Sequence, residues 1–162
     1  MRKILMLALA ASLFGCGAAP HATPAASTAP AIRRINPPTL STPHGYSHVV
    51  ETRRGRTIYI AGQVALDRNG KGVGPGDLRA QSEQVFTNLQ AALAAVGADF
   101  THVVKLNFFV TELDDARLAI LRDVRDRHID TAHPPASTLV QVVRLFRPEF
   151  VIEVEAVAVV DD

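Results

Sequence analysis

The stretch from Pro135 to Ala158 reads PASTLVQVVRLFRPEFVIEVEAVA and decides the fold. It predicts a proline-bounded turn, a strand, a short Arg-Pro break and a second strand. Side chains alternate between the two faces of a strand. One face of the last strand carries Ile152, Val154, Ala156 and Ala158, and the other carries Val151, Glu153, Glu155 and Val157. A carboxylate among valines needs a partner, so Glu153 is a candidate catalytic residue; two ordinary solvated glutamates are the alternative.

Two upstream segments, residues 47–52 and 57–63, are rich in the Val, Ile and Tyr that favour strands. The cluster RRGR separates them, so the sequence predicts a hairpin. Between Asp77 and Gly97, apolar residues recur at spacings of three, four and seven. This pattern is typical of an amphipathic helix, with Asp77 able to cap its start and Gly97 its end.

Residues 102–110 predict another strand, and Thr111 with Asp114 resembles a loose capping box for a helix that reaches about His128. The order β-β-α-β-α-β-β indicates an α+β fold with two helices on one face of the sheet. The other face is expected to carry an apolar patch of Tyr59, Phe109, Val151 and Val157. Self-association would cover such a patch.

The N-terminal part of the chain has the composition of a processing signal. A basic MRK is followed by eleven mainly apolar residues, too few to span a bilayer, and by LFGC, which resembles a lipobox. Residues 1–16 are therefore predicted to be a lipoprotein signal peptide with Cys16 as the lipidation site, and Gly17 favours sorting to the outer membrane. Residues 17–38, rich in Ala, Pro and Thr, predict a disordered tether, and residues 39–162 predict one domain.

Charge and motif content argue against several classes of function. Residues 39–162 hold 13 basic and 16 acidic side chains, which is unlike the basic face of a nucleic-acid-binding protein. The six histidines form no HxH or HExxH spacing, so no metal site is expected. Neither a phosphate-binding loop nor a Gly-x-Ser-x-Gly nucleophile is present, and we expect no cofactor.

Five motifs occur in the order and spacing of one known family. They are Gly45-Tyr46-Ser47-His48-Val49, Ile58-Tyr59-Ile60-Ala61-Gly62-Gln63, Gln81 through Asn88-Leu89 to Leu93 and Gly97, Val103-Val104-Lys105, and the stretch quoted first. Together they cover roughly residues 43 to 160 and resemble the RidA/YjgF (Rid) superfamily. The resemblance implies a chorismate-mutase-like fold, a homotrimer with the sheets facing inward, and three ligand clefts at subunit boundaries. Some members have been named endoribonucleases, which the charge does not support.

The resemblance also implies site residues. Family members with imine deaminase activity hold the substrate carboxylate with the arginine of a Pro-Ala-Arg motif, and a glutamate on the last strand helps to position water. By position the glutamate is Glu153, and Tyr46 is the tyrosine that lines the cleft. Ser137 stands where the active members have arginine, and Thr138 matches the small hydroxyl residue that follows.

Loss of a guanidinium–carboxylate pair predicts a roughly ten- to hundredfold weaker hold on an imino acid. Arg144 lies seven residues from Ser137, and an odd offset along a strand points it to the opposite face. A neutral polar cleft for an uncharged or cationic ligand is therefore expected, and a vestigial cleft filled with water is the alternative. Its residues are Gln63, Asn107, Ser137, Thr138 and Glu153.

Two functions follow from these features. The first is an envelope-tethered protein that binds a small molecule, or another envelope protein, without turnover. The second is hydrolysis of a reactive imine or enamine to a carbonyl compound and ammonia, with water positioned by Glu153. The missing arginine and the predicted export favour the first, because the family's usual substrates arise from cytosolic enzymes.

Overall fold

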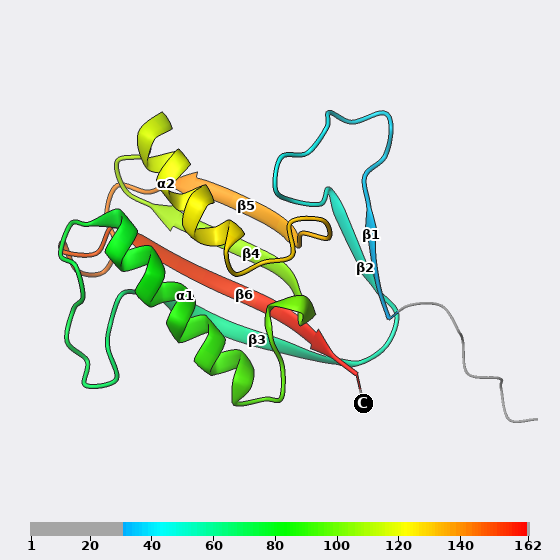
Figure 1. The fold of residues 1–162 in the computed structure, drawn as a ribbon, viewed down its shortest axis with the longest axis horizontal. Coiled ribbons are helices and arrows are strands. Elements are labelled where there is room, and N and C mark those ends of the chain that lie inside the picture. Colours follow the sequence, from blue (N-terminus) through cyan, green and yellow to red (C-terminus); the bar gives the residue numbers. More distant parts are fainter. Residues whose placement is uncertain (1–30, 162) are drawn as a thin grey trace, which may run out of the picture.

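The computed structural model describes residues 31–161, which form two β-sheets and two α-helices. The elements in chain order are β1 (Ile32–Ile35), β2 (Val49–Thr52), β3 (Arg56–Gln63), α1 (Leu78–Ala94), a short 3-10 turn (Phe100–His102), β4 (Val103–Val110), α2 (Asp115–Asp126), β5 (Ala136–Gln141) and β6 (Ile152–Val160). Figure 1 shows both helices on one side of the larger sheet, with the β1–β2 pair standing beyond the end of the sheet at which β5 begins.

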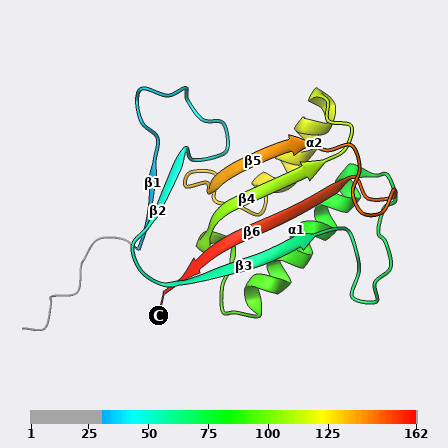
Figure 2. The same ribbon diagram turned by 180° about the vertical axis from the view of Figure 1, so that it is seen from behind.

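The larger sheet has the strand order β3-β6-β4-β5. β6 runs antiparallel to both β3 and β4, whereas β4 and β5 are parallel and are connected through α2. Seen from behind, the strands lie in front of the helices, and no helix or strand of residues 31–161 covers this face (Figure 2). The predicted α+β fold with two helices on one face is therefore confirmed.

Aspartate side chains fix the start of each helix. The carboxylate of Asp77 accepts a hydrogen bond from the backbone N–H of Ala80 (3.1 Å), and that of Asp114 accepts from the N–H of Arg117 (2.7 Å). Each contact satisfies one of the backbone donors that a helix leaves unpaired in its first turn. Asp114, rather than Thr111, is thus the N-cap of α2.

The hydrophobic core lies between the helices and the larger sheet. Ile152, Val154, Ala156 and Ala158 of β6 are buried there, as the alternation predicts. Val151 was expected on the opposite face, but this is wrong, because its side chain is only 8% exposed. Val151 precedes β6, and its backbone N–H donates to Oε1 of the fully buried Gln81 (2.8 Å), so the strand alternation does not extend to it.

Two further predictions are corrected by the strand pairing. The expected hairpin of residues 47–52 and 57–63 does not form, because β2 pairs with β1 and β3 pairs with β6. Ile32–Ile35 was assigned to the disordered tether but forms β1, so the described structure includes residues before 39. Backbone hydrogen bonds can hold so short a strand despite its weak apolar pattern. The predicted signal peptide and most of the tether lie outside the described residues.

Candidate functional site

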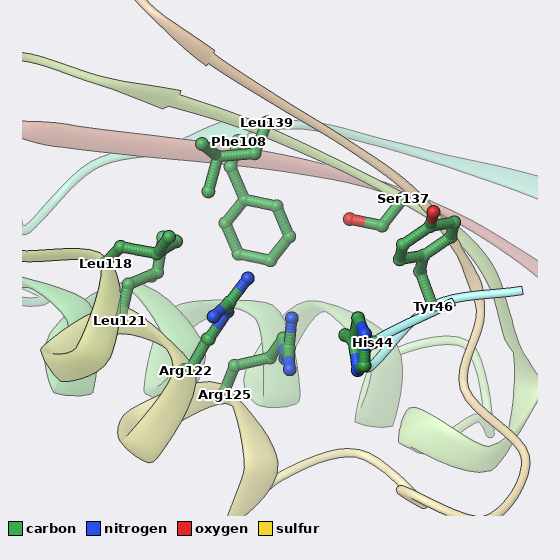
Figure 3. A pocket seen from close by; sticks show the side chains of 9 residues that line it. All are labelled: His44, Tyr46, Phe108, Leu118, Leu121, Arg122, Arg125, Ser137 and Leu139. Carbon is green, nitrogen blue, oxygen red and sulfur yellow. The ribbon is translucent and has the colours of Figure 1, made fainter. Parts of the chain in front are cut away.

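A cavity of about 300 Å³ lies between α2 and the strands β4 and β5. We call it the Ser137 pocket; its lining residues are His44, Tyr46, Phe108, Leu118, Leu121, Arg122, Arg125, Ser137 and Leu139. Figure 3 shows one side built from apolar side chains and the other from Ser137, Tyr46 and His44. The pocket is therefore amphipathic.

The apolar side follows from strand register and helix period. Phe108 of β4 is paired with Leu139 of the parallel strand β5, so both side chains lie on the helix-covered face. Leu118 and Leu121 approach from α2, where residues three apart share a face. Phe108 is only 2% exposed and so belongs to the core as well as to the pocket wall.

Ser137 lies on the same face because it is paired with the buried Leu106 of β4. Its hydroxyl points into the pocket (Figure 3). Within residues 31–161 the structure shows no hydrogen-bond partner for this hydroxyl. The position therefore offers one free hydroxyl to whatever occupies the pocket.

The loop that carries His44 and Tyr46 is attached directly to the start of β5. The backbone N–H of Ser47 donates to the carbonyl of Pro135 (2.9 Å), and its hydroxyl donates to the carbonyl of Pro134 (2.7 Å). Gly45 has φ +75°, in the region that favours glycine, and an added Cβ would collide with the Arg125 guanidinium. Gly45 therefore lets the loop approach α2.

Two arginines of α2 complete the pocket. Leu118, Leu121, Arg122 and Arg125 occupy the i, i+3, i+4 and i+7 positions of one helix face. Both guanidinium groups point toward the space between Phe108 and Ser137 (Figure 3). Arg125 is held by Asp126, whose Oδ1 lies 2.7 Å from both Nε and Nη2, while Arg122 forms no ion pair within the described part of the chain.

These arginines correct the expectation of a neutral cleft around Ser137. The sequence near Ser137 offered Arg144 as the closest replacement arginine, whereas the cations come from α2, twelve to fifteen residues before Ser137. The helical spacing of Leu118, Leu121, Arg122 and Arg125 was the signal that could have identified them. The pocket is cationic within a single chain.

The remaining predicted site residues lie elsewhere. We call the side of the sheet away from the helices the open face; it carries Tyr59, Lys105, Asn107, Phe109, Thr138, Glu153, Glu155 and Val157. Lys105 Nζ donates to Thr138 Oγ1 (2.6 Å), and Asn107 Nδ2 donates to Glu155 Oε1 (2.6 Å). The Glu153 carboxylate lies against Gly62, where a Cβ would collide with it.

The predicted set is thus divided. Tyr46 and Ser137 meet in the Ser137 pocket, whereas Asn107, Thr138 and Glu153 lie on the open face. Gln63 is at the end of β3, and its amide donates to the carbonyl of Ala61 (3.0 Å). Ser137 and Glu153 therefore do not share a pocket within one chain.

Residues 31–161 were predicted to hold no metal site. This part of the protein contains no cluster of three or more His, Cys, Asp or Glu side chains arranged to hold a metal ion. Its helices are all too short or too polar to traverse a bilayer.

Comparison with known proteins identifies the family. The model described as Endoribonuclease L-PSP matches residues 38–160. Protein DfrA of Myxococcus xanthus is 41% identical over 114 residues, 70% of this chain and 84% of the relative. A 2-iminobutanoate/2-iminopropanoate deaminase of Dermatophagoides farinae is 32% identical over 130 residues, 80% of this chain and 97% of the relative.

A solved structure gives the same assignment. The protein of unknown function YyfB from Yersinia pestis, of the conserved Rid protein family, has a TM-score of 0.69 and 39% identity. The similarity covers 80% of this chain and 99% of that one. The order of motifs, the matched fold and these relatives agree, and the chain belongs to the RidA/YjgF superfamily and has its chorismate-mutase-like fold.

Proposed function

We propose that this protein binds a small molecule in the Ser137 pocket and is a poor 2-imino acid deaminase. The observation that carries the proposal is the hydroxyl of Ser137, which points into a formed pocket. The family resemblance implies that members with imine deaminase activity have an arginine at this position. A hydroxyl cannot reproduce the planar, bidentate recognition of a carboxylate by guanidinium. Arg122 and Arg125 reach the pocket from α2, and so present their charge from a different direction.

The assembly proposed for this function is a homotrimer whose ligand clefts lie at subunit boundaries. Ser137 and Glu153 lie on opposite faces of one chain's sheet, so a cleft between chains is one way to bring them together. The open face also carries Tyr59, which is 81% exposed, beside the partly buried Phe109. Covering these aromatic side chains with a second copy would remove apolar surface from water.

The proposed location is the cell envelope, with a lipid on Cys16 and outer-membrane sorting. Support comes from the basic start, the apolar run and the LFGC sequence. A Cys16→Ser variant is expected to leave the membrane fraction and become soluble after cell disruption. Equal membrane association of this variant and the wild type would reject the anchor.

Imine or enamine deamination is the second candidate, because the relative from Dermatophagoides farinae is named a 2-iminobutanoate/2-iminopropanoate deaminase. The family resemblance also implies Glu153 as the residue that positions the water. In this reaction water would add to the C=N carbon, and expulsion of the nitrogen as ammonia would leave the carbonyl compound. No step requires an oxidant or a cofactor.

Freshly generated 2-iminopropanoate distinguishes the two candidates. We expect the wild type to give at most about a tenth of the kcat/KM of an arginine-containing relative, in keeping with the loss of a charge-assisted contact. Ser137→Arg is expected to raise kcat/KM, whereas Ser137→Met, which adds volume without charge, is the matched control and is not. Wild-type turnover equal to that of the relative would reject the binding function in favour of deamination.

A further inference from the structure

The Ser137 pocket adjoins a second cavity, and the two arginines of α2 lie where they meet. The second cavity has a volume of about 310 Å³ and shares His44, Arg122 and Arg125 with the first. Its remaining lining residues are Gly45, Asp126 and Thr131. Together the cavities have an apolar end at Phe108 and a polar end at Thr131, with guanidinium groups between them.

The charge at this junction favours an anion. The residues that line the Ser137 pocket include two arginines and no aspartate or glutamate. Asp126 lines the second cavity, but its Oδ1 is engaged by Nε and Nη2 of Arg125. Arg122 has no carboxylate partner within the described residues, so its guanidinium keeps its donors for a ligand.

The apolar end limits the size and shape of the ligand. The whole Ser137 pocket would hold about ten water molecules at about 30 Å³ each, and Phe108, Leu118, Leu121 and Leu139 line its apolar side. An aromatic ring or a branched aliphatic group would fill it, whereas an iminopropanoate of six non-hydrogen atoms would leave much of it empty. Apolar walls with a few polar groups at one side are typical of sites that orient amphipathic molecules.

We propose that the Ser137 pocket selects an amphipathic monoanion, whose anionic group is bound by Arg122 and Arg125 and whose apolar body packs on Phe108 and the three leucines. This inference rests on the proposed binding function and makes Arg122 the main determinant of specificity. The Ser137 hydroxyl donates a further hydrogen bond to a polar atom of the ligand. In this proposal two arginines of α2 take the place of the strand-borne arginine that the family resemblance implies for members with imine deaminase activity.

A charge series of one molecular shape tests the proposal on the full chain. The probes are 3-phenylpropanoate, the neutral 3-phenylpropanamide and the cationic 3-phenylpropylamine, measured by titration calorimetry. We expect the carboxylate to bind at least about tenfold more tightly than the amide or the amine, as a charge-assisted contact implies. Chemical shifts of the methyl groups of Leu118, Leu121 and Leu139 report whether a probe occupies the pocket.

Arg122→Gln is expected to weaken carboxylate binding about tenfold or more and to leave amide binding unchanged. Arg127→Gln is the matched control, because Arg127 caps the C-terminal end of the same helix but pairs with Glu83 away from the pocket. Arg125→Gln provides a second test, with thermal unfolding to establish that the variant is folded. Unchanged carboxylate binding by both folded pocket variants overturns the proposal.

The same titrations separate this inference from the proposed function. The amide or the amine could shift the pocket methyl groups and bind at least as tightly as the carboxylate. That result would reject anion selection but leave the binding pocket intact. If no probe perturbs these methyl groups, both the anion selection and the proposed binding function fail.

Discussion

Phe108 and Phe109 are neighbours on β4, yet they lie in opposite environments. Phe108 belongs to the buried core and to the wall of the Ser137 pocket, whereas Phe109 lies partly buried on the open face beside Glu153. On the helix-covered side, a single chain is enough to bury the apolar side chains and to form the pocket. The open face leaves aromatic side chains in water, so it is the side on which a second copy would have an energetic effect.

The largest expected effect comes from truncating one phenylalanine at a time. Phe108→Ala should lower the free energy of unfolding by about 3–5 kcal/mol, because it removes a fully buried ring and leaves a cavity. Phe109→Ala should cost about 1–2 kcal/mol within a single chain, since its ring is only partly buried. Urea unfolding of both variants measures the difference.

Protein concentration makes this comparison sharper. The loss caused by Phe108→Ala should be the same at every protein concentration, whereas that of Phe109→Ala should grow as the wild type assembles. Sedimentation of the same samples reports the assembly directly. If both variants lose the same stability at every protein concentration, a second copy does not cover the open face.

A second test concerns the polar attachment of α1 on the helix-covered side. The buried amide of Gln81 donates to the carbonyls of Gly74 (2.9 Å) and Glu149 (2.6 Å) and accepts from the N–H of Val151 (2.8 Å). Gln81→Ala should cost about 2–4 kcal/mol, because several buried backbone groups lose their partner at once. The loss is read from urea unfolding.

Gln90 provides the matched control, because it lies on the exposed side of the same helix. Gln90→Ala should change stability by less than about 0.5 kcal/mol. If Gln81→Ala lowers the free energy of unfolding no more than the control does, water replaces the hydrogen bonds of the amide without loss of stability.

The sequence predicts the faces of the larger sheet better than it predicts the strand partners. Alternation identified the buried set of β6, because burial on one face imposes a period of two on the side chains. Alternation could not predict that β1 pairs with β2. The four residues of β1 have little apolar pattern, and their pairing depends on backbone hydrogen bonds that any sequence can form. The failed hairpin has the same cause: local turn residues do not reveal that β3 has β6 as its partner.

The site was predicted less completely than the fold. Position in the motifs identified Tyr46 and Ser137, which do meet in the pocket. It also placed Glu153 in the cleft; within one chain the register of β4 with β5 and β6 puts Glu153 on the other face of the sheet, so its role in a cleft between chains stays a prediction. Arg122 and Arg125 were missed because the sequence distance from Ser137 along its strand does not predict which residues of α2 pack against that strand.

The smallest expected effect concerns a histidine on the helix-covered side. His128 stacks on Phe86, with ring centroids 4.8 Å apart and an interplanar angle of 13°. Burial lowers the pKa of His128 below its ordinary value near 6.5, and Arg127 acts in the same direction, while Glu83 opposes them. Its neutral form therefore favours the folded state.

The sign of the pH dependence follows from this direction. Above the unfolded pKa of about 6.5 the stabilising contribution of neutral His128 is complete, and it is lost as pH falls through the lower folded pKa. His128→Phe keeps a ring beside Phe86 and removes the titration, so urea unfolding should show a smaller loss of stability from pH 7.5 to 5. The difference should be smaller than the losses predicted above, because the imidazole is partly exposed and close to Glu83. Parallel pH profiles for the variant and the wild type would assign the acid sensitivity to other groups and leave the stacked imidazole as a packing element alone.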